Sequence, residues 1–310
     1  MRKGDSPKLL YLARLFQSIP PIYFSWIDYL IPKKNKNNKY PIIFILAIPR
    51  GGSTIAYQLL NRGTNSFYLS NLWNLLFSIP LLGGKLVSVT SENKIFKSDK
   101  GLVSGLSGES EGMKFWEYWT GQGLEEKRNV VPARRLSYIK SVFSTLLSKK
   151  TPMISGYLGH SFSVEQLRKD FPGCIFVYVK RDKLSNVYSL VKTYNEFAIR
   201  DNNFNWISLK PKGWGDRVND EINDKALWQF NAIKNKIESN ISDKDTITFN
   251  YENICKDPDK FIRDVSTFAL QKNMMLKLNA ANIPNKLIPS IINSEENDLT
   301  REIAGLLKNE

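Results

Sequence analysis

The residues of this chain best suited to chemistry lie in one short segment, Pro49-Arg50-Gly51-Gly52-Ser53-Thr54. The segment follows an apolar run of strand length, residues 42–48, and opens a stretch of helical periodicity that ends at Gly63. Two adjacent glycines allow a tight turn and let a ligand approach the main chain closely. Because the first N–H groups of a helix are free and its N-terminus is electropositive, the segment predicts an anion-binding turn, here called the cradle. The predicted contacts are Arg50, Gly51, Gly52, Ser53, Thr54 and Ile55.

The cradle differs from a Walker A loop. That loop has the pattern Gly-x-x-x-x-Gly-Lys-Ser/Thr, in which the lysine binds the β- and γ-phosphates and the hydroxyl binds magnesium. In this chain Gly52 is followed directly by Ser53, and no lysine stands in the turn. The segment therefore argues against a metal-dependent triphosphate site. Taken alone, it also fits an ordinary strand-to-helix turn with a chance pair of glycines.

A second candidate anion site lies further along the chain. The apolar run 175–179 ends in Lys180-Arg181-Asp182, and Ser189 follows Arg181 by eight residues. A guanidinium at the carboxyl end of a buried strand can bind an anion through two parallel hydrogen bonds. An internal salt bridge between Arg181 and Asp182 is the other interpretation of the same residues.

The elements that position these residues alternate between strand and helix from residue 152 onward. Short apolar runs predict strands buried on both faces, as in a parallel sheet, and the stretches between them have helical periodicity and capping residues. We expect strands over 152–155, 174–179 and 246–251 and helices over 163–171, 183–198, 225–241 and 257–270. This pattern predicts a three-layer α/β fold with a doubly wound parallel sheet flanked by helices, in which ligands bind at the carboxyl ends of the strands.

Composition and length limit the class of protein. The 310 residues contain 44 Lys and Arg against 30 Asp and Glu, a formal charge of +14. Such an excess attracts a nucleotide, an acidic lipid surface or a polyanionic glycan, although a solvated basic face would give the same count. We expect one domain over 41–270, preceded by a helical and extended segment over 1–40 and followed by a helical extension over 271–310.

Few residues of the chain are typical metal ligands. Its two cysteines, Cys174 and Cys255, lie far apart, His160 is its only histidine, and no Cys-x-x-Cys pair is present. We therefore expect neither a disulfide framework nor a metal site.

The N-terminal segment is apolar and aromatic, but Arg14, Pro20, Pro21 and Asp28 interrupt it. It is too broken to span a bilayer, and no cleavage site of a secretory signal follows it. We expect a cytoplasmic protein in which this segment packs on the domain. Peripheral contact with a membrane surface is the alternative.

Together these segments resemble the sulfotransferase family that uses 3′-phosphoadenosine 5′-phosphosulfate (PAPS). The cradle is similar to the family's Pro-Lys/Arg-Ser/Gly-Gly-Ser/Thr-Thr turn, which holds the 5′-phosphosulfate. Arg181 and Ser189 match the family's 3′-phosphate pair in residue type and interval. The resemblance implies a P-loop NTPase-like sulfotransferase fold, with PAPS as the sulfuryl donor and no metal.

Two further stretches carry the same resemblance. Residues 171–182 are similar to the family's Phe-Pro-Asp-Ala-x-Phe-Ile-x-x-x-Arg-Asp stretch. Asn250-Tyr-Glu-Asn-Ile, followed by Asp257-Pro258, is similar to its Tyr-Glu-Asp-Leu and Asp-Pro segments. In all, the resemblance covers roughly residues 41–65, 151–200 and 246–270.

The resemblance implies in-line transfer of a sulfuryl group to a hydroxyl or amine, promoted by positioning and charge stabilisation. Arg50, where many members have lysine, would neutralise charge growing on the bridging oxygen. As general base, His160 is the first candidate, because cytosolic members place a Lys-Thr-His segment nearby. Glu109, and after it Glu111, are the alternatives, because other branches of the family use a glutamate. A capping histidine and solvated loop carboxylates are the structural interpretations of these residues.

The sequence does not identify the acceptor. We expect a carbohydrate or glycolipid, since the stretch 199–223 places Trp206 and Trp214 among basic residues, where they can stack on a ring and form a lid, or pack into the core. We expect no nucleic-acid partner.

Residues 271–310 lack the Arg-Lys-Gly segment that closes on the nucleotide in cytosolic members, so the adenine contacts stay unassigned. The competing functions are a P-loop-type nucleotide kinase and a non-catalytic binder of anionic lipid or polyanionic glycan.

Overall fold

The central element of the fold is a parallel β-sheet. The computed structural model describes Asp28 and residues 39–87, 105–200, 205–279, 283–293 and 297–308. Within these residues the strands form one five-stranded sheet in the order β2-β3-β1-β4-β5, and every neighbouring pair is parallel. The strands are β1 (Ile42–Ala47), β2 (Phe67–Tyr68), β3 (Met153–Ser155), β4 (Ile175–Lys180) and β5 (Thr246–Asn250). The predicted α/β class is confirmed, and β2 is a strand that the sequence pattern did not predict.

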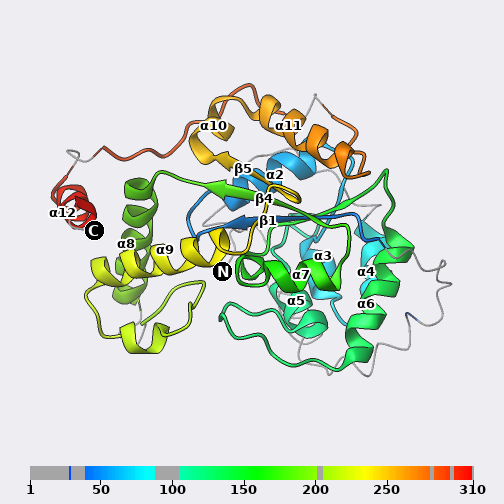
Figure 1. The fold of residues 1–310 in the computed structure, drawn as a ribbon, viewed down its shortest axis with the longest axis horizontal. Coiled ribbons are helices and arrows are strands. Elements are labelled where there is room, and N and C mark those ends of the chain that lie inside the picture. Colours follow the sequence, from blue (N-terminus) through cyan, green and yellow to red (C-terminus); the bar gives the residue numbers. More distant parts are fainter. Residues whose placement is uncertain are drawn as a thin grey trace.

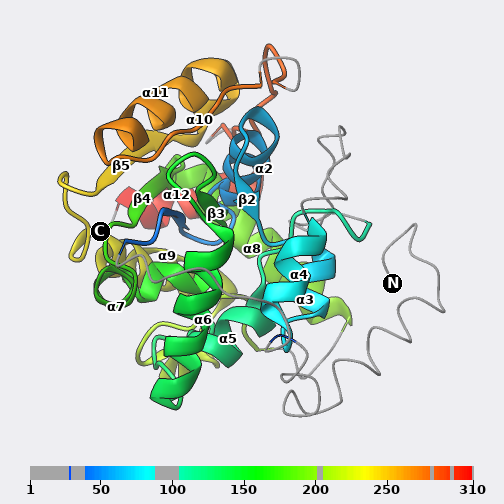
Figure 2. The same ribbon diagram turned by 90° about the vertical axis from the view of Figure 1, so that its right-hand side faces the viewer.

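Helices cover both faces of the sheet, so that the domain has three layers (Figure 1, Figure 2). The first layer contains α2 (Ser53–Gly63), α10 (Tyr251–Lys256) and α11 (Pro258–Gln271). The opposite layer contains α5 (Met113–Thr120), α6 (Ala133–Leu146), η3 (Leu158–Phe162), α7 (Val164–Asp170), α8 (Lys183–Arg200) and α9 (Ile222–Glu238). The remaining helices are α3 (Asn71–Leu75), α4 (Pro80–Val87), η4 (Trp214–Arg217) and α12 (Asp298–Lys308).

Strand β1 explains why the sheet needs two helical layers. Its side chains point alternately to opposite faces, and both sets are apolar. Ile42, Phe44 and Leu46 pack into the core shared with α5 to α9, whereas Ile43 and Ile45 pack into the core shared with α2 and α11. All five are at most 1% exposed. A continuous apolar run of this length is therefore stable only between two layers.

The element boundaries follow local chemistry. Helix α7 lies within the predicted range 163–171, with Ser163 at its N-cap position, and residues Leu158–Phe162 form the separate turn η3 before it. The chain turns from β5 directly into the short helix α10, and α11 then begins at Pro258. The Asp257 carboxylate accepts a hydrogen bond from Lys260 N at 2.9 Å, which caps α11.

Most of the predicted N-terminal segment lies outside the described residues, and Asp28 is the main exception. Its buried carboxylate accepts hydrogen bonds from Leu81 N at 2.8 Å, Leu82 N at 3.0 Å and Tyr138 Oη at 2.8 Å. The segment therefore touches the domain at least at the first turn of α4. Helix α12, within the predicted C-terminal extension, packs against α8. No helix in the described part of the chain is long and apolar enough to cross a bilayer.

Candidate active site

The cradle lies at the carboxyl end of the central strand β1. Gly51 N donates to Ile48 O at 2.9 Å, which closes the turn. Arg50 and Gly52 both have left-handed backbones, with φ of 66° and 97°. A side chain at Gly52 would collide with the ring of Tyr251, so the glycine is required by packing as well as by conformation.

Helix α2 begins immediately after the turn. Ala56 N donates to Gly52 O at 3.2 Å, the first main-chain bond of the helix, and the N–H groups of Ser53, Thr54 and Ile55 precede it. These groups and the positive end of the helix dipole are the features that an anion can use. The structure therefore gives the predicted cradle the expected strand–turn–helix form.

Arg181 and Ser189, the second predicted anion site, lie against the cradle. Arg50 Nε donates to Ser189 Oγ at 3.1 Å, and Arg181 Nη1 donates to Arg50 O at 2.8 Å. No salt bridge joins Arg181 to Asp182 among the described residues; the Asp182 carboxylate instead accepts from Ser185 N at 2.8 Å, at the start of α8. Residues more than 130 positions apart thus form one cationic site at the carboxyl ends of β1 and β4.

The Arg181 guanidinium lies among partners that the sequence patterns did not assign to it. Its carbon lies 5.2 Å from the centre of the Tyr251 ring, and its Nη2 donates to Ser290 O. Burial lowers the pKa of Arg181, and the nearby charge of Arg50 lowers it further. Two arginines held this close favour an anion between or beside them. Tyr251 belongs to the Tyr-Glu-Asn segment, which was the signal in the sequence for this part of the site.

The C-terminal stretch 283–293 crosses this end of the site (Figure 1). Ser290 O accepts from Arg181, and Ile292 N donates to Ser185 Oγ at 3.1 Å. Leu287 N donates to Cys255 O at 2.8 Å, which fixes the stretch against α10. No motif in residues 271–310 indicated this placement, since the contacts use main-chain groups that any residue could supply.

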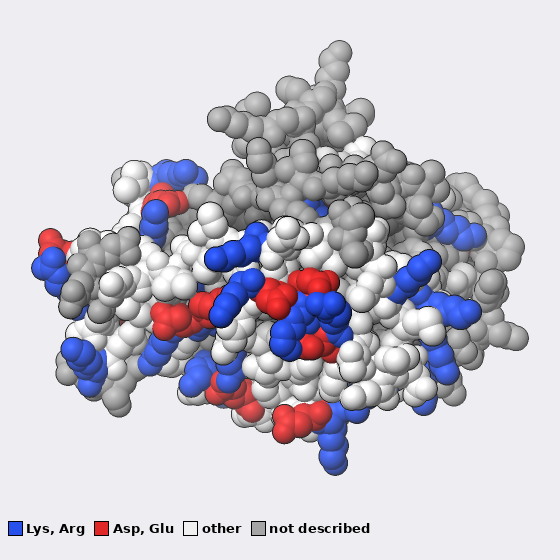
Figure 3. Space-filling view, turned by 90° about the horizontal axis from the view of Figure 1, so that it is seen from above, with Lys and Arg blue, Asp and Glu red and all other residues white. Residues whose placement is uncertain are grey.

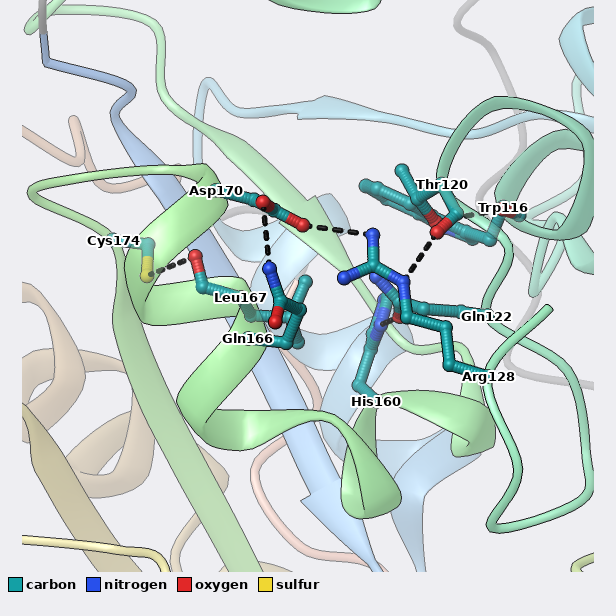
Figure 4. Close-up of polar contacts among 9 residues, drawn as sticks. All are labelled: Trp116, Thr120, Gln122, Arg128, His160, Gln166, Leu167, Asp170 and Cys174. Carbon is teal, nitrogen blue, oxygen red and sulfur yellow. Dashed lines mark hydrogen bonds and ion pairs between the residues drawn. The ribbon is translucent and has the colours of Figure 1, made fainter. Parts of the chain in front are cut away.

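His160, the first candidate base, is fully buried in η3. Its Nδ1 lies 2.7 Å from Gln122 Oε1 and its Nε2 lies 2.8 Å from Ser155 Oγ. Because an amide oxygen only accepts, Nδ1 carries the proton and Nε2 accepts from the Ser155 hydroxyl. Burial lowers the pKa of His160 well below its usual value. Figure 4 shows the ring beside Gln122, next to an Arg128 side chain that reaches Thr120 and Asp170.

Glu109, the second candidate base, is paired. Its carboxylate accepts from Arg62 Nε at 2.6 Å and from Arg62 Nη2 at 2.8 Å. Both side chains are buried, with 6% and 5% exposure. This geometry is typical of a bidentate structural ion pair, which ties the loop to α2.

Glu111, the third candidate, is in a different environment from Glu109. Burial raises the pKa of Glu111 to about 7. No hydrogen bond or ion pair joins its carboxylate to any described residue. The loop is held at the carboxyl end of β2, because Ser110 N donates to Leu69 O at 2.7 Å and Tyr57 Oη donates to Ser110 O at 3.2 Å. Burial raises the pKa of Tyr157, which follows β3 by two residues, and the negative charges of Glu117 and Glu111 raise it further.

Strand order determines how these groups are arranged. The cradle follows the central strand β1, Arg181 follows β4 on one side, and the loop of Glu111 and the chain after β3 lie on the other. All of them lie at the carboxyl edge of the sheet, where ligands bind in open α/β folds. The site therefore has a cationic side for anions and, across the cradle, a side with a carboxylate of raised pKa.

On the face of the molecule seen in Figure 3, the described charges do not form one basic patch. In Figure 3, Lys and Arg side chains alternate with Asp and Glu over the visible surface. On α11, Lys260 pairs with Asp264 at 2.6 Å and Arg263 pairs with Asp259. Among the described residues, no group of three or more His, Cys, Asp or Glu side chains could hold a metal ion.

Comparison with known proteins identifies the family. The sequence profile of the Sulfotransferase family matches residues 41–270. Since this match covers most of the chain, the protein belongs to the sulfotransferase family. No curated protein matches the chain at a significant level.

Several solved sulfotransferase structures are similar, at low identity. Sulfotransferase STF9 from Mycobacterium avium has 16% identity and a TM-score of 0.48, with 78% of this chain and 65% of that chain covered. The sulfotransferase domain of the curacin biosynthetic pathway has 17% identity and a TM-score of 0.39, with 89% and 99% covered. A sulfotransferase from Alicyclobacillus acidocaldarius has 14% identity and a TM-score of 0.42, with 87% and 92% covered. The chain thus spans slightly less than two thirds of the M. avium protein.

Proposed function

We propose that this protein transfers a sulfuryl group from PAPS to a hydroxyl or amine acceptor. The observation that carries the proposal is the direct contact between the two predicted anion sites, in which Arg50 binds Ser189 and Arg181 binds the main chain of Arg50. A nucleotide with a phosphate at both its 3′ and 5′ positions suits two linked cationic regions, whereas a single-phosphate ligand would use only one of them.

The proposed roles follow from position. The N–H groups of Gly52 to Ile55, with the Ser53 and Thr54 hydroxyls, would hold the 5′-phosphate, while the Gly51 N–H closes the turn on Ile48 O. Arg181 with Ser189 would hold the 3′-phosphate. In the transfer step the acceptor oxygen forms a bond to sulfur while the bond from sulfur to the bridging phosphate oxygen breaks. Arg50 would stabilise the negative charge that develops on that oxygen. The acceptor proton passes to a general base.

We propose Glu111 as that base. A base is most effective when its pKa is near the working pH, and burial raises the pKa of Glu111 to about 7. His160 is less suited, because both ring nitrogens are bonded inside the core and its pKa is lowered. Glu109 is less suited because its two oxygens are bound to Arg62.

A carbohydrate or glycolipid remains our proposed acceptor. The partly buried Trp214 has Lys210 Nζ 4.1 Å from its ring centre, and Arg217 lies 5.7 Å from the ring of Trp228. Aromatic faces with cationic neighbours support stacking with a sugar or binding of an acidic one. Trp206 is buried and donates to Leu209 O at 2.9 Å, so it supports this surface from below. The cytoplasmic location and the membrane contact of the N-terminal segment stay predictions.

The decisive test is binding of adenosine 3′,5′-bisphosphate, the product that PAPS leaves. We expect this compound to raise the melting temperature of the full chain in the presence of a chelator, and we expect ATP with magnesium not to do so. Stabilisation by ATP with magnesium alone would instead support the kinase. Salt-sensitive binding to anionic vesicles or heparin, with no response to either nucleotide, would support the non-catalytic binder. A screen of acceptors with labelled PAPS then identifies the second substrate.

A further inference from the structure

A buried amide without hydrogen-bond partners lies directly behind the cradle. Asn186, in the first turn of α8, is fully buried. Neither its Nδ2 nor its Oδ1 has a hydrogen-bond partner among the described residues. An unpaired buried amide lowers the stability of a fold, so natural cores rarely keep one without a reason.

The Asn186 amide lies close to the main chain of the cradle. A side chain at Gly51 would place its Cβ 3.3 Å from Asn186 Nδ2 and 2.8 Å from Ile48 O. The amide therefore lies against the turn, beside the carbonyl that closes it. Ser189 lies three residues further along α8, on the same side of the helix, and binds Arg50. One face of α8 thus supports the cradle at two points, and only one of them is hydrogen-bonded.

We propose that Asn186 is a positioning residue for the cradle, and that its side-chain amide pairs with the main chain of residues 48–52 when a nucleotide 5′-phosphate is bound. This inference rests on the proposed function. An amide supplies two N–H donors and one acceptor oxygen, which suits a turn that presents both carbonyl and N–H groups. Asn186 does not reach the reacting atoms, because the turn lies between them.

A physical coupling links phosphate binding to this amide. When the N–H of a peptide unit binds an anion, the unit is polarised and its carbonyl becomes a stronger acceptor. If the cradle directs its N–H groups toward the phosphate, carbonyls on the far side of the turn become better partners for Asn186 Nδ2. The free energy gained when the Asn186 amide forms hydrogen bonds then contributes to the free energy of nucleotide binding. In the protein without nucleotide, the amide stays unpaired.

This coupling predicts opposite effects of one substitution on stability and on binding. Asn186→Leu has a similar volume and no polar atoms. We expect the melting temperature of the protein alone to stay equal or to rise by a few degrees. We expect the Kd for adenosine 3′,5′-bisphosphate to rise at least about tenfold, or about 1.4 kcal/mol, with the KM for the acceptor unchanged. A purely structural role would lower the melting temperature and leave the Kd unchanged.

Gln58 provides the matched control. It is fully buried in α2, and both of its amide atoms also lack partners among the described residues. We expect Gln58→Leu to raise the melting temperature as Asn186→Leu does, with nucleotide affinity unchanged. An equal loss of affinity in Gln58→Leu would overturn the proposal, because any change beneath the cradle would then have the same effect.

Asn186→Asp covers the case in which the leucine variant does not fold. It keeps the shape and one acceptor but removes both N–H donors and adds a negative charge near the phosphate. Calorimetric titration should give a Kd raised at least as much as in Asn186→Leu. A wild-type Kd in either folded variant overturns the proposal for Asn186 and leaves the proposed function intact. Failure of the wild-type protein to bind the bisphosphate overturns both.

Discussion

Arg50 donates a hydrogen bond from Nε to the hydroxyl of Ser189 at 3.1 Å. The two residues are 139 positions apart, one in the turn after β1 and the other in the helix after β4. Arg181 adds a second link, because its Nη1 donates to the main-chain oxygen of Arg50 at 2.8 Å. The spacing between the two proposed phosphate sites is therefore held by side chains as well as by the sheet.

Ser189→Ala tests this contact. We expect the Kd for adenosine 3′,5′-bisphosphate and the KM for PAPS to rise about three- to tenfold, because the change removes the partner of Arg50 and a hydroxyl of the proposed 3′-phosphate site. Stability should change little, since the contact is exposed. Calorimetric titration measures the effect, and Ser144→Ala on α6 is the control. Equal affinities in wild type and Ser189→Ala would exclude a role for this hydroxyl.

Glu111→Gln tests the proposed base. We expect kcat to fall about 10²- to 10⁴-fold with the affinity for the bisphosphate unchanged, because the amide cannot take the acceptor proton. In the wild type, kcat/KM should rise with pH up to about 7, the raised pKa of Glu111, and then level off. Steady-state assays with labelled PAPS check both expectations. A variant with full kcat would rule out Glu111.

The same substitution should change how stability depends on pH. The pKa of Glu111 is raised from 4.5 to about 7, so the folded protein holds the proton more tightly than the unfolded chain. Its stabilising contribution is complete below pH 4.5 and is lost as the pH rises through about 7. Relative to Glu111→Gln, the wild type should lose stability across this window, measured by denaturant unfolding. Parallel curves for the two proteins would contradict the raised pKa.

Glu109→Gln tests the structural role of the other carboxylate. The change leaves the buried charge of Arg62 without its counterion, so we expect the free energy of unfolding to fall by about 3–5 kcal/mol. The folded variant should keep its affinity for the bisphosphate. Replacing both Arg62 and Glu109 by leucine should recover most of the stability, because no buried charge then remains. A stable but inactive Glu109→Gln would instead make Glu109 the base.

His160→Ala tests whether His160 is a structural core residue or the catalytic base. We expect a loss of about 2–4 kcal/mol in stability, because the change opens a cavity and leaves Gln122 and Ser155 unpaired. Since the pKa of His160 is lowered from 6.5, the wild type should lose stability as the pH falls below that value, and His160→Ala should lose less. Unfolding curves and kcat on the folded variant are the measurements. A normal stability with abolished turnover would restore His160 as the base.

Local sequence was sufficient to predict the strand–turn–helix of residues 42–63. An apolar run, two glycines and a periodic helix are all properties of neighbouring residues, so no distant contact was needed to specify them. The interval between Arg181 and Ser189 is also a local property, because both residues belong to one strand end and the helix that follows it. The short strand β2 and the main-chain contacts of residues 283–293 could not be predicted in this way, because distant partners form them.

The cradle, the alternation of strands and helices from residue 152 onward and the family resemblance were therefore properties of the sequence by itself, because each depends on residue types at short spacing. The state of each ionisable group was decided only by the tertiary structure. Glu109 and Glu111 are two residues apart in the same loop, yet Glu109 is buried in an ion pair with Arg62, whereas Glu111 is partly buried and has a pKa raised to about 7. Burial and pairing depend on which segments pack around a carboxylate, and that is a property of the folded chain.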